Sequence, residues 1–319
     1  MRVVLQNDKS RSFRHGNRSI RSFRVTSRPL ARGVLAVLAA AALASGCAPD
    51  ASGARGAPGP QPLEAPPARA LDSYASELRA AHAARAAAAR RWRLKEVPLA
   101  APPPPATKPE ITAREGFEVE GQEDLPPVFT TVPTEKRIVF LTIDDGAEKD
   151  PAFLRMMSEL RIPYTVFLTD QEIKDDYGYF TNMQARGITL NNHTLSHPYL
   201  PGLSYEEQER EICGMQDVIE EHYGTRPTLF RPPFGNYNRD TLRAAKACGI
   251  EYAPIWSEEV YVDHWEYREW DQELHPGDIV LTHFRGRDEW GGAMTDMVRR
   301  FLDRVTAEGY AVARLEDYL

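Results

Sequence analysis

The chain has 319 residues, of which 42% are apolar and 27% are charged, the composition of a folded globular protein rather than a disordered or membrane-embedded one. The formal net charge is −7, but residues 111–319 carry 21 Lys and Arg against 39 Asp and Glu. Such an acidic segment repels polyanions, which argues against nucleic acid as a partner and favours a neutral or weakly charged substrate.

The first 47 residues have the features of a bacterial export signal. A basic stretch ending at Arg32 precedes about eleven apolar residues, too few for the roughly 20 that a bilayer requires. Small residues then lead into Cys47, a pattern that resembles a lipoprotein signal with this cysteine as the lipidated new N-terminus. We predict a lipid anchor on the outer side of the cytoplasmic membrane, with ordinary secretion as the alternative. The long basic stretch also suggests that translation starts near Val25.

Residues 48–115 form a predicted linker. They are rich in Ala, Pro and Gly, and they include a run of prolines over residues 102–105, which is typical of stiff, extended spacers. Within this linker, residues 71–96 are rich in Ala and Arg and could form an isolated helix. Because its apolar stripe is mostly alanine and has little to bury, we assign this helix to the linker.

From residue 116 the pattern becomes one of short apolar segments that alternate with helical ones. The segments predicted as strands are 138–141, 164–168, 187–190, 228–230, 250–256, 278–281 and 310–315. Ser204 and Glu207 form a predicted capping box at the start of one helix. Residues 238–248 form a second predicted helix, which ends at Gly249. The alternation predicts an α/β fold, a distorted (β/α) barrel of about seven parallel strands in a single domain over residues 116–319.

Polar segments follow four of the predicted strands. Asp144 and Asp145 follow the first, and His193 and His197 follow the third. The turn 231–235 and the segment 281–283 follow two later strands. In such barrels functional residues gather at the carboxyl ends of the strands, so we expect these segments to meet. Each segment alone has a structural alternative, since D-D-G is also an ordinary turn and a histidine pair also occurs on surfaces.

Together these segments resemble the polysaccharide deacetylase family, carbohydrate esterase family 4, over about residues 137–319. T-I-D-D-G is similar to the family's first motif, H-T-L-S-H-P to its second, R-P-P-F-G to its third and L-T-H to its fifth. The resemblance implies a hydrolase that removes acetyl groups from N-acetylated, or O-acetylated, polysaccharides. It also implies a divalent metal, with zinc preferred and cobalt or nickel as alternatives. The implied ligands are Asp145, His193 and His197.

The resemblance further assigns catalytic roles. Asp144 would be the general base, His283 the general acid, and Arg231 would position the base and the substrate groove. The backbone N–H of Phe234 would bind the oxyanion. These residue types suit amide hydrolysis, which requires a Lewis acid, a base for water and a proton donor for the departing amine.

The fourth motif of the family, W-x-x-D-x-x-D-W, is altered in this chain. The sequence from Trp256 reads W-S-E-E-V-Y-V-D-H-W, so either Glu259 or Asp263 could orient the acid histidine. Trp256 and Leu281 are expected in the substrate groove, with core packing as the alternative for the tryptophan.

Two other functional hypotheses use the same residues. One is a catalytically inactive glycan-binding protein of the cell wall on the same fold, which the intact base and ligand set disfavour. The other is an iron(II) oxygenase, disfavoured because such sites usually pair one histidine with a nearby acid. We expect a monomer that binds acetylated glycan and meets the membrane only through its lipid anchor. Cys213 and Cys248 are expected either as a disulfide or as two buried thiols.

Overall fold

The computed structural model describes residues 68–319, so the predicted signal, Cys47 and the alternative start near Val25 lie outside the described residues. The described part forms one compact unit. Within it, none of the helices has both the length and the apolar character needed to cross a lipid bilayer.

The sheet is organised around β2 (Ile138–Asp145), in which every residue is buried. This strand pairs in parallel with β3 (Thr165–Leu168), β8 (Ile279–His283) and β9 (Ala311–Ala313). On either side the sheet continues in parallel through β4 (Leu190–Asn192) and β6 (Glu258–Val260). An antiparallel strand, β7 (Trp265–Tyr267), forms the edge beside β6 and was not expected from the sequence.

The pairings run in a circuit, as the predicted barrel requires. Residues 228–230, expected as a strand, contribute only the bridges Asn192–Phe230 and Leu229–Tyr252. The neighbouring strand is reduced to β5 (Ala253–Pro254), which pairs with β1 (Val128–Phe129). A bridge between Thr131 and Asp278 then leads back to the start of β8. The predicted α/β fold is confirmed: six strands of the seven-stranded sheet are parallel, and β1 and β5 form a further parallel pair. β5 is only two residues long, and its Pro254 lacks the N–H that a ladder needs.

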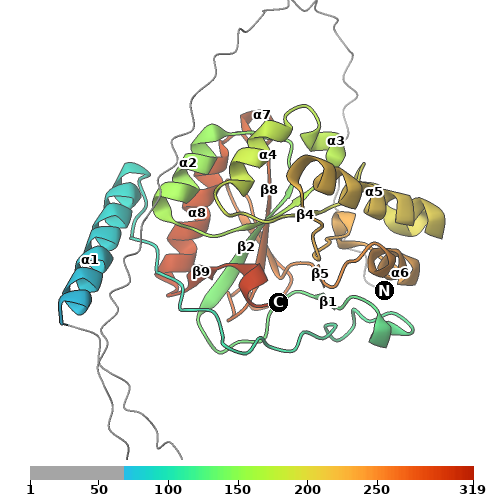
Figure 1. The fold of residues 1–319 in the computed structure, drawn as a ribbon, viewed down its shortest axis with the longest axis horizontal. Helices are drawn as coiled ribbons and strands as arrows, with labels where there is room; N and C mark the ends of the chain where they lie inside the picture. The colour runs from blue at the N-terminus through green and yellow to red at the C-terminus, as the bar shows by residue number, and fades with distance from the viewer. Residues whose placement is uncertain (1–67) are drawn as a thin grey trace, which may run out of the picture. The chain divides into compact units, whose positions relative to one another are not determined.

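Helices cover the sheet. Figure 1 shows β2 and β8 together at the centre, with α2 (Pro151–Leu160) and α8 (Met294–Ala307) on one side of them. On another side α5 (Tyr205–Tyr223) packs against α6 (Arg239–Ala247). The predicted capping box of Ser204 and Glu207 starts α5. The remaining helical elements are short: η1 (Gln122–Asp124), α3 (Asp170–Ile173), α4 (Tyr177–Gln184), η2 (Leu200–Gly202), η3 (Pro233–Gly235), α7 (Arg287–Trp290) and η4 (Leu315–Asp317).

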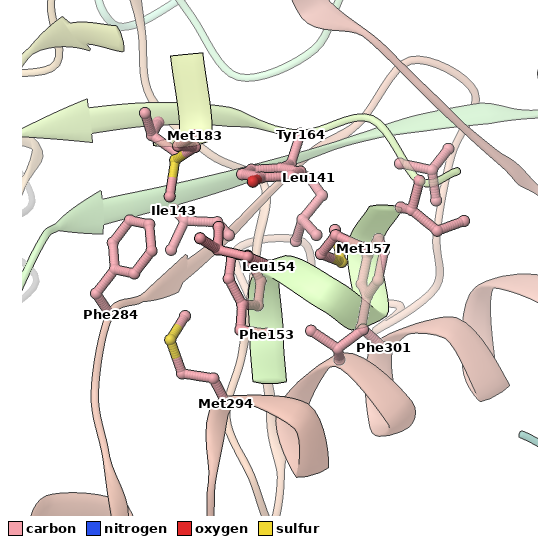
Figure 2. Packing of buried hydrophobic residues seen from close by; sticks show 14 of the residues in the cluster. Leu141, Ile143, Phe153, Leu154, Met157, Tyr164, Met183, Phe284, Met294 and Phe301 are labelled. Atoms are coloured by element: carbon pink, nitrogen blue, oxygen red, sulfur yellow. The ribbon is translucent and has the colours of Figure 1, made fainter. Parts of the chain in front are cut away.

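Alternation along β2 separates two apolar layers. Leu141 and Ile143 face outward, and Figure 2 shows them among side chains of α2 and α8 such as Phe153 and Phe301. Phe140 belongs instead to the cluster on the inner face of the sheet. Because side chains of a strand alternate between its faces, Thr142 and Asp144 share that inner face with Phe140. The strand thus delivers Asp144 to the inside of the barrel at its carboxyl end.

The Ala/Arg-rich segment forms α1 (Ala68–Arg91), but its last turns are not isolated. Ala88 and Ala89 are buried in the same core cluster as the outer residues of β2, and Arg91 forms an ion pair with Glu159 of α2 at 2.8 Å. Small alanine side chains let the helix backbone come close to its neighbour, so an alanine stripe packs well despite its low hydrophobicity. The domain boundary at residue 116 stays a prediction.

Cys213 of α5 and Cys248 at the end of α6 form a disulfide. We expect the double variant Cys213→Ala/Cys248→Ala to lose about 2–4 kcal/mol of unfolding free energy, because the bond closes a loop between cysteines 35 residues apart. Urea unfolding with and without a reductant measures this loss. The reductant should destabilise the wild type and leave the variant unchanged; equal stability of variant and oxidised wild type would contradict the prediction.

Candidate active site

The paired aspartates lie where β2 turns sharply. Asp145 has φ 76°, a left-handed conformation that costs a residue with a side chain about 1–3 kcal/mol. Gly146 follows with φ 109°, and a Cβ there would lie 2.5 Å from Ile173, so only glycine fits. This strained turn brings two consecutive carboxylates to the same end of the barrel instead of sending them to opposite faces.

The two histidines occupy a loop that starts directly after β4. The Asn192 side chain accepts a hydrogen bond from the Thr194 N–H at 2.9 Å and donates to Ile212 O at 2.8 Å, which fixes the start of the loop. Thr194 and His197 both have positive φ, and the Thr194 hydroxyl accepts from the His197 N–H. The loop therefore turns back on itself and places the imidazoles of His193 and His197 with ring centres 4.9 Å apart.

Both imidazoles converge on one carboxylate oxygen. Asp145 Oδ1 lies 3.6 Å from His193 Nε2 and 3.5 Å from His197 Nε2. This oxygen is buried and has no hydrogen-bond partner. The structure thus brings together the three residues that the sequence predicted as metal ligands, with one atom of each within 4.8 Å of the others.

The protonation of these groups fits a cation. His193 Nδ1 lies 2.6 Å from Arg231 O, so Nδ1–H donates to the carbonyl and Nε2 keeps a free lone pair. Burial, and then the neighbouring His197, lower the pKa of His193 to about 3, so the ring is neutral. Two neutral imidazoles and a carboxylate are a common donor set for catalytic zinc. The orphaned Asp145 Oδ1 faces both Nε2 atoms, which is the arrangement expected for residues that hold a divalent cation.

Asp144 is held by a fully buried arginine. Arg231 Nη1 donates to Asp144 Oδ1 at 2.8 Å and to the Thr142 hydroxyl at 2.9 Å, while Nε donates to Pro254 O. Burial raises the pKa of Asp144 to about 7, although Arg231 and His283 oppose this rise. A bound dication would lower it, because positive charge favours the carboxylate. Arg231 thus positions Oδ1 of Asp144, while Oδ2 lies 3.6 Å from His193 Nε2.

His283 ends β8, next to Asp144 across the β2–β8 pairing. Its Nδ1 lies 3.1 Å from the buried carboxylate of Glu259. Burial alone lowers the pKa of His283, but Glu259 and then Asp145 and Asp144 outweigh it and raise the pKa to about 9. Asp263, the other candidate partner, has a side chain 82% exposed and pairs with His264. The structure therefore places Glu259, and not Asp263, beside the imidazole.

The expected groove residues differ in their surroundings. Phe234 is 40% exposed, has φ 60°, and its ring lies 4.5 Å from that of His197. Trp256 is partly buried and packs beside Arg231, with ring and guanidinium 5.8 Å apart. Leu281 is 1% exposed and lies on β8 below His283. Phe234 is thus the one of the three that presents an open aromatic face beside the proposed ligands.

Arg285 is a site residue that the sequence analysis missed. Its Nη2 lies 2.7 Å from Asp145 Oδ2, the carboxylate oxygen that does not face the histidines. The position two residues after His283 was the only available signal, because arginine is not part of the motifs that carry the resemblance. The arginine orients Asp145 so that Oδ1 points to both imidazoles.

Comparison with known proteins relates the chain to polysaccharide deacetylases. The family model described as polysaccharide deacetylase matches residues 131–253. An uncharacterized protein of Streptomyces coelicolor is 41% identical over 196 residues, which cover 61% of this chain and 78% of that protein. A peptidoglycan-N-acetylglucosamine deacetylase of Bacillus cereus is 25% identical over 202 residues, which cover 59% of this chain and 91% of the relative. A solved structure of a peptidoglycan N-acetylglucosamine deacetylase shares the fold, with a TM-score of 0.53, 21% identity, and coverage of 62% and 94%.

Proposed function

The chain belongs to the polysaccharide deacetylase family, and we propose that it is a metal-dependent hydrolase that removes acetyl groups from an N-acetylated glycan. The observation that carries the proposal is that the two aspartates have different partners. Asp145 shares its orphaned oxygen with two imidazoles, while Asp144 is bound by Arg231 and keeps one oxygen for the reaction. A protein that only bound glycan would not need a second carboxylate at this place.

Asp145, His193 and His197 would hold the cation, which we propose is zinc, with cobalt or nickel as substitutes. The chemistry that a divalent cation supplies at such a site is polarisation of the acetyl carbonyl and a lower pKa of water. Arg285 holds the other oxygen of Asp145 and keeps the ligand carboxylate in orientation.

Two side chains on the neighbouring strands β2 and β8 transfer the protons. Asp144 Oδ2 accepts the proton of the attacking water, since Oδ1 is engaged by Arg231. As the carbon–nitrogen bond breaks, His283 donates its Nε2 proton to the amine, while its Nδ1–H remains bonded to Glu259. The products are acetate and the free amino sugar. The N–H of Phe234 is proposed to bind the oxyanion during this step.

The Glu259→Gln variant tests how the acid is tuned. His283 must be protonated, so activity should fall as pH rises through its pKa. Loss of the Glu259 charge lowers that pKa, so the alkaline limb of the kcat/KM profile should move to lower pH. At alkaline pH, each unit of this movement reduces kcat/KM about tenfold. The full pH–rate profile with metal-loaded enzyme measures it.

Asp263→Asn is the matched control, because this carboxylate is exposed and pairs with His264 instead. Its alkaline limb should coincide with that of the wild type. An unmoved limb in Glu259→Gln, or an equal shift in both variants, would overturn the assignment of Glu259.

We propose peptidoglycan as the substrate, because the Bacillus cereus relative is named for deacetylating it. The test compares release of acetate and free amine from cell-wall glycan, chitooligosaccharides and acetylxylan, with zinc or cobalt added. We expect the highest rate on wall glycan. If metal-loaded protein binds glycan but releases acetate from none of the three, the inactive-binder hypothesis is correct instead.

We further propose that the enzyme acts as a monomer outside the cytoplasmic membrane, anchored by a lipid on Cys47. The support is the export-signal pattern of residues 1–47 and the spacer composition that follows. Fractionation of expressing cells tests it: Cys47→Ala should move the protein out of the membrane fraction. A variant that remains membrane-bound would contradict the lipid anchor.

A further inference from the structure

A second group of ionisable side chains lies on the opposite face of the strands that carry the proposed acid. Glu259 and His283 point into the barrel from β6 and β8, so alternation turns Glu258 and Asp278 to the outer face. Glu258 is 1% exposed and Asp278 is 2% exposed. Together with His275 they form a cluster in which one nitrogen or oxygen atom of each lies within 4.8 Å of the others.

The turn between His275 and Asp278 is rigid. Asp278 Oδ2 accepts from the His275 N–H at 2.6 Å, and His275 Nδ1 lies 3.4 Å from the same oxygen. Gly277 has φ 89°, and a Cβ there would lie 2.0 Å from Val132 O, so the backbone is held against its neighbour. The imidazole is therefore held beside the buried carboxylate by the backbone itself.

Glu258 has no donor within the described part of the chain. Both of its carboxylate oxygens are buried without a hydrogen-bond partner. Burial, and then the Asp278 carboxylate that it faces, raise the pKa of Glu258 to about 10. Arg304 of α8 is near, but its guanidinium pairs with Glu308 at 2.7 Å and donates to Gln272 O. Two buried carboxylates that face each other need either a shared proton or a cation between them.

We propose that Glu258, His275 and Asp278 form a second binding site for a divalent cation, separate from the proposed catalytic one. Buried carboxylates and one partly exposed imidazole are a mixed oxygen and nitrogen donor set. Such a set favours zinc or manganese over calcium and magnesium, which prefer oxygen alone. This proposal does not rest on the proposed activity.

The ion would brace the support of the catalytic acid. Glu258 precedes Glu259 on β6, and Asp278 immediately precedes β8, which ends at His283. A cation shared by the outer face of both strands holds their register, and this register sets the contact between Glu259 and His283 on the inner face.

The experiment counts metal in the purified full chain. Protein is loaded with zinc, desalted through a weak chelator and analysed by mass spectrometry for zinc per chain. We expect two equivalents in the wild type, one in His275→Ala, one in Glu258→Gln, one in His197→Ala, and none in the double variant His197→Ala/His275→Ala. His264→Ala is the matched control, an exposed histidine beside carboxylates but outside the cluster, and it should keep two equivalents.

Each other outcome decides the question. A wild type with one equivalent that His197→Ala loses, and that His275→Ala keeps, would show that Glu258 and Asp278 share a proton instead. One equivalent lost in His275→Ala and kept in His197→Ala would support this site and contradict the proposed catalytic one. If Glu258→Gln does not fold, His275→Ala alone tests the site. The His275 side chain is 43% exposed, so its removal leaves the core intact.

Discussion

Asp144→Asn should lower kcat by about 10²–10⁴-fold while the protein keeps its full metal content, the range by which a positioned general base accelerates a reaction. The amide has nearly the same shape as the carboxylate, and its oxygen can still accept the hydrogen bond from Arg231 Nη1. It cannot accept the proton of water. Acetate release under saturating substrate, with zinc per chain measured on the same sample, gives both quantities.

A loss of stability must be distinguished from a loss of chemistry. Arg231 is fully buried, and removal of the charge opposite a buried cation can cost about 3–5 kcal/mol. Thermal unfolding of the variant shows whether it is folded at the assay temperature. Asp150→Asn is the matched control, because this residue caps α2 outside the site and asparagine caps as well as aspartate. Full activity in Asp144→Asn would refute its assignment as the base.

His197→Ala should remove the catalytic metal and the activity together. The loss of a partner outside the coordination sphere already weakens metal binding by about 10–100-fold, and the loss of a direct ligand should weaken it further. His197 is the better probe of the two histidines, because its side chain is 25% exposed whereas His193 is buried against Arg231 O. Zinc titration followed by acetate release measures the apparent affinity and the residual rate.

The contrast with Asp144→Asn makes the pair of variants informative. Excess zinc should partly restore His197→Ala, since two ligands remain, but it should not restore Asp144→Asn. His264→Ala again serves as a control histidine and should behave as the wild type. If His197→Ala retains both its catalytic zinc and its rate, the cation is held by a different set of residues.

The sequence alone indicates which residues form the candidate active site and at which end of the fold they lie. Strand periodicity and turn residues are local properties, so they place Asp144 at a strand end and His193 in the loop after another. The resemblance then proposed three ligands, and the structure brings those three together. The α/β fold was predictable for the same reason, because alternating helices and strands are visible without any knowledge of how they pack.

Contacts between distant segments could not be predicted from the sequence, because they depend on how the strands align in the folded chain. Glu259 and Asp263 are equally plausible partners of His283 in the sequence, and the choice depends on the β6–β8 register, which sets Glu259 opposite Leu281. The role of Arg285 could not be predicted either, because no local sequence pattern indicates an ion pair between residues 140 positions apart. The same holds for the cluster around Glu258, because the sequence does not show that a buried carboxylate lacks a hydrogen-bond donor. Periodicity reveals which face a residue occupies, but the alignment of neighbouring strands decides which side chain it meets.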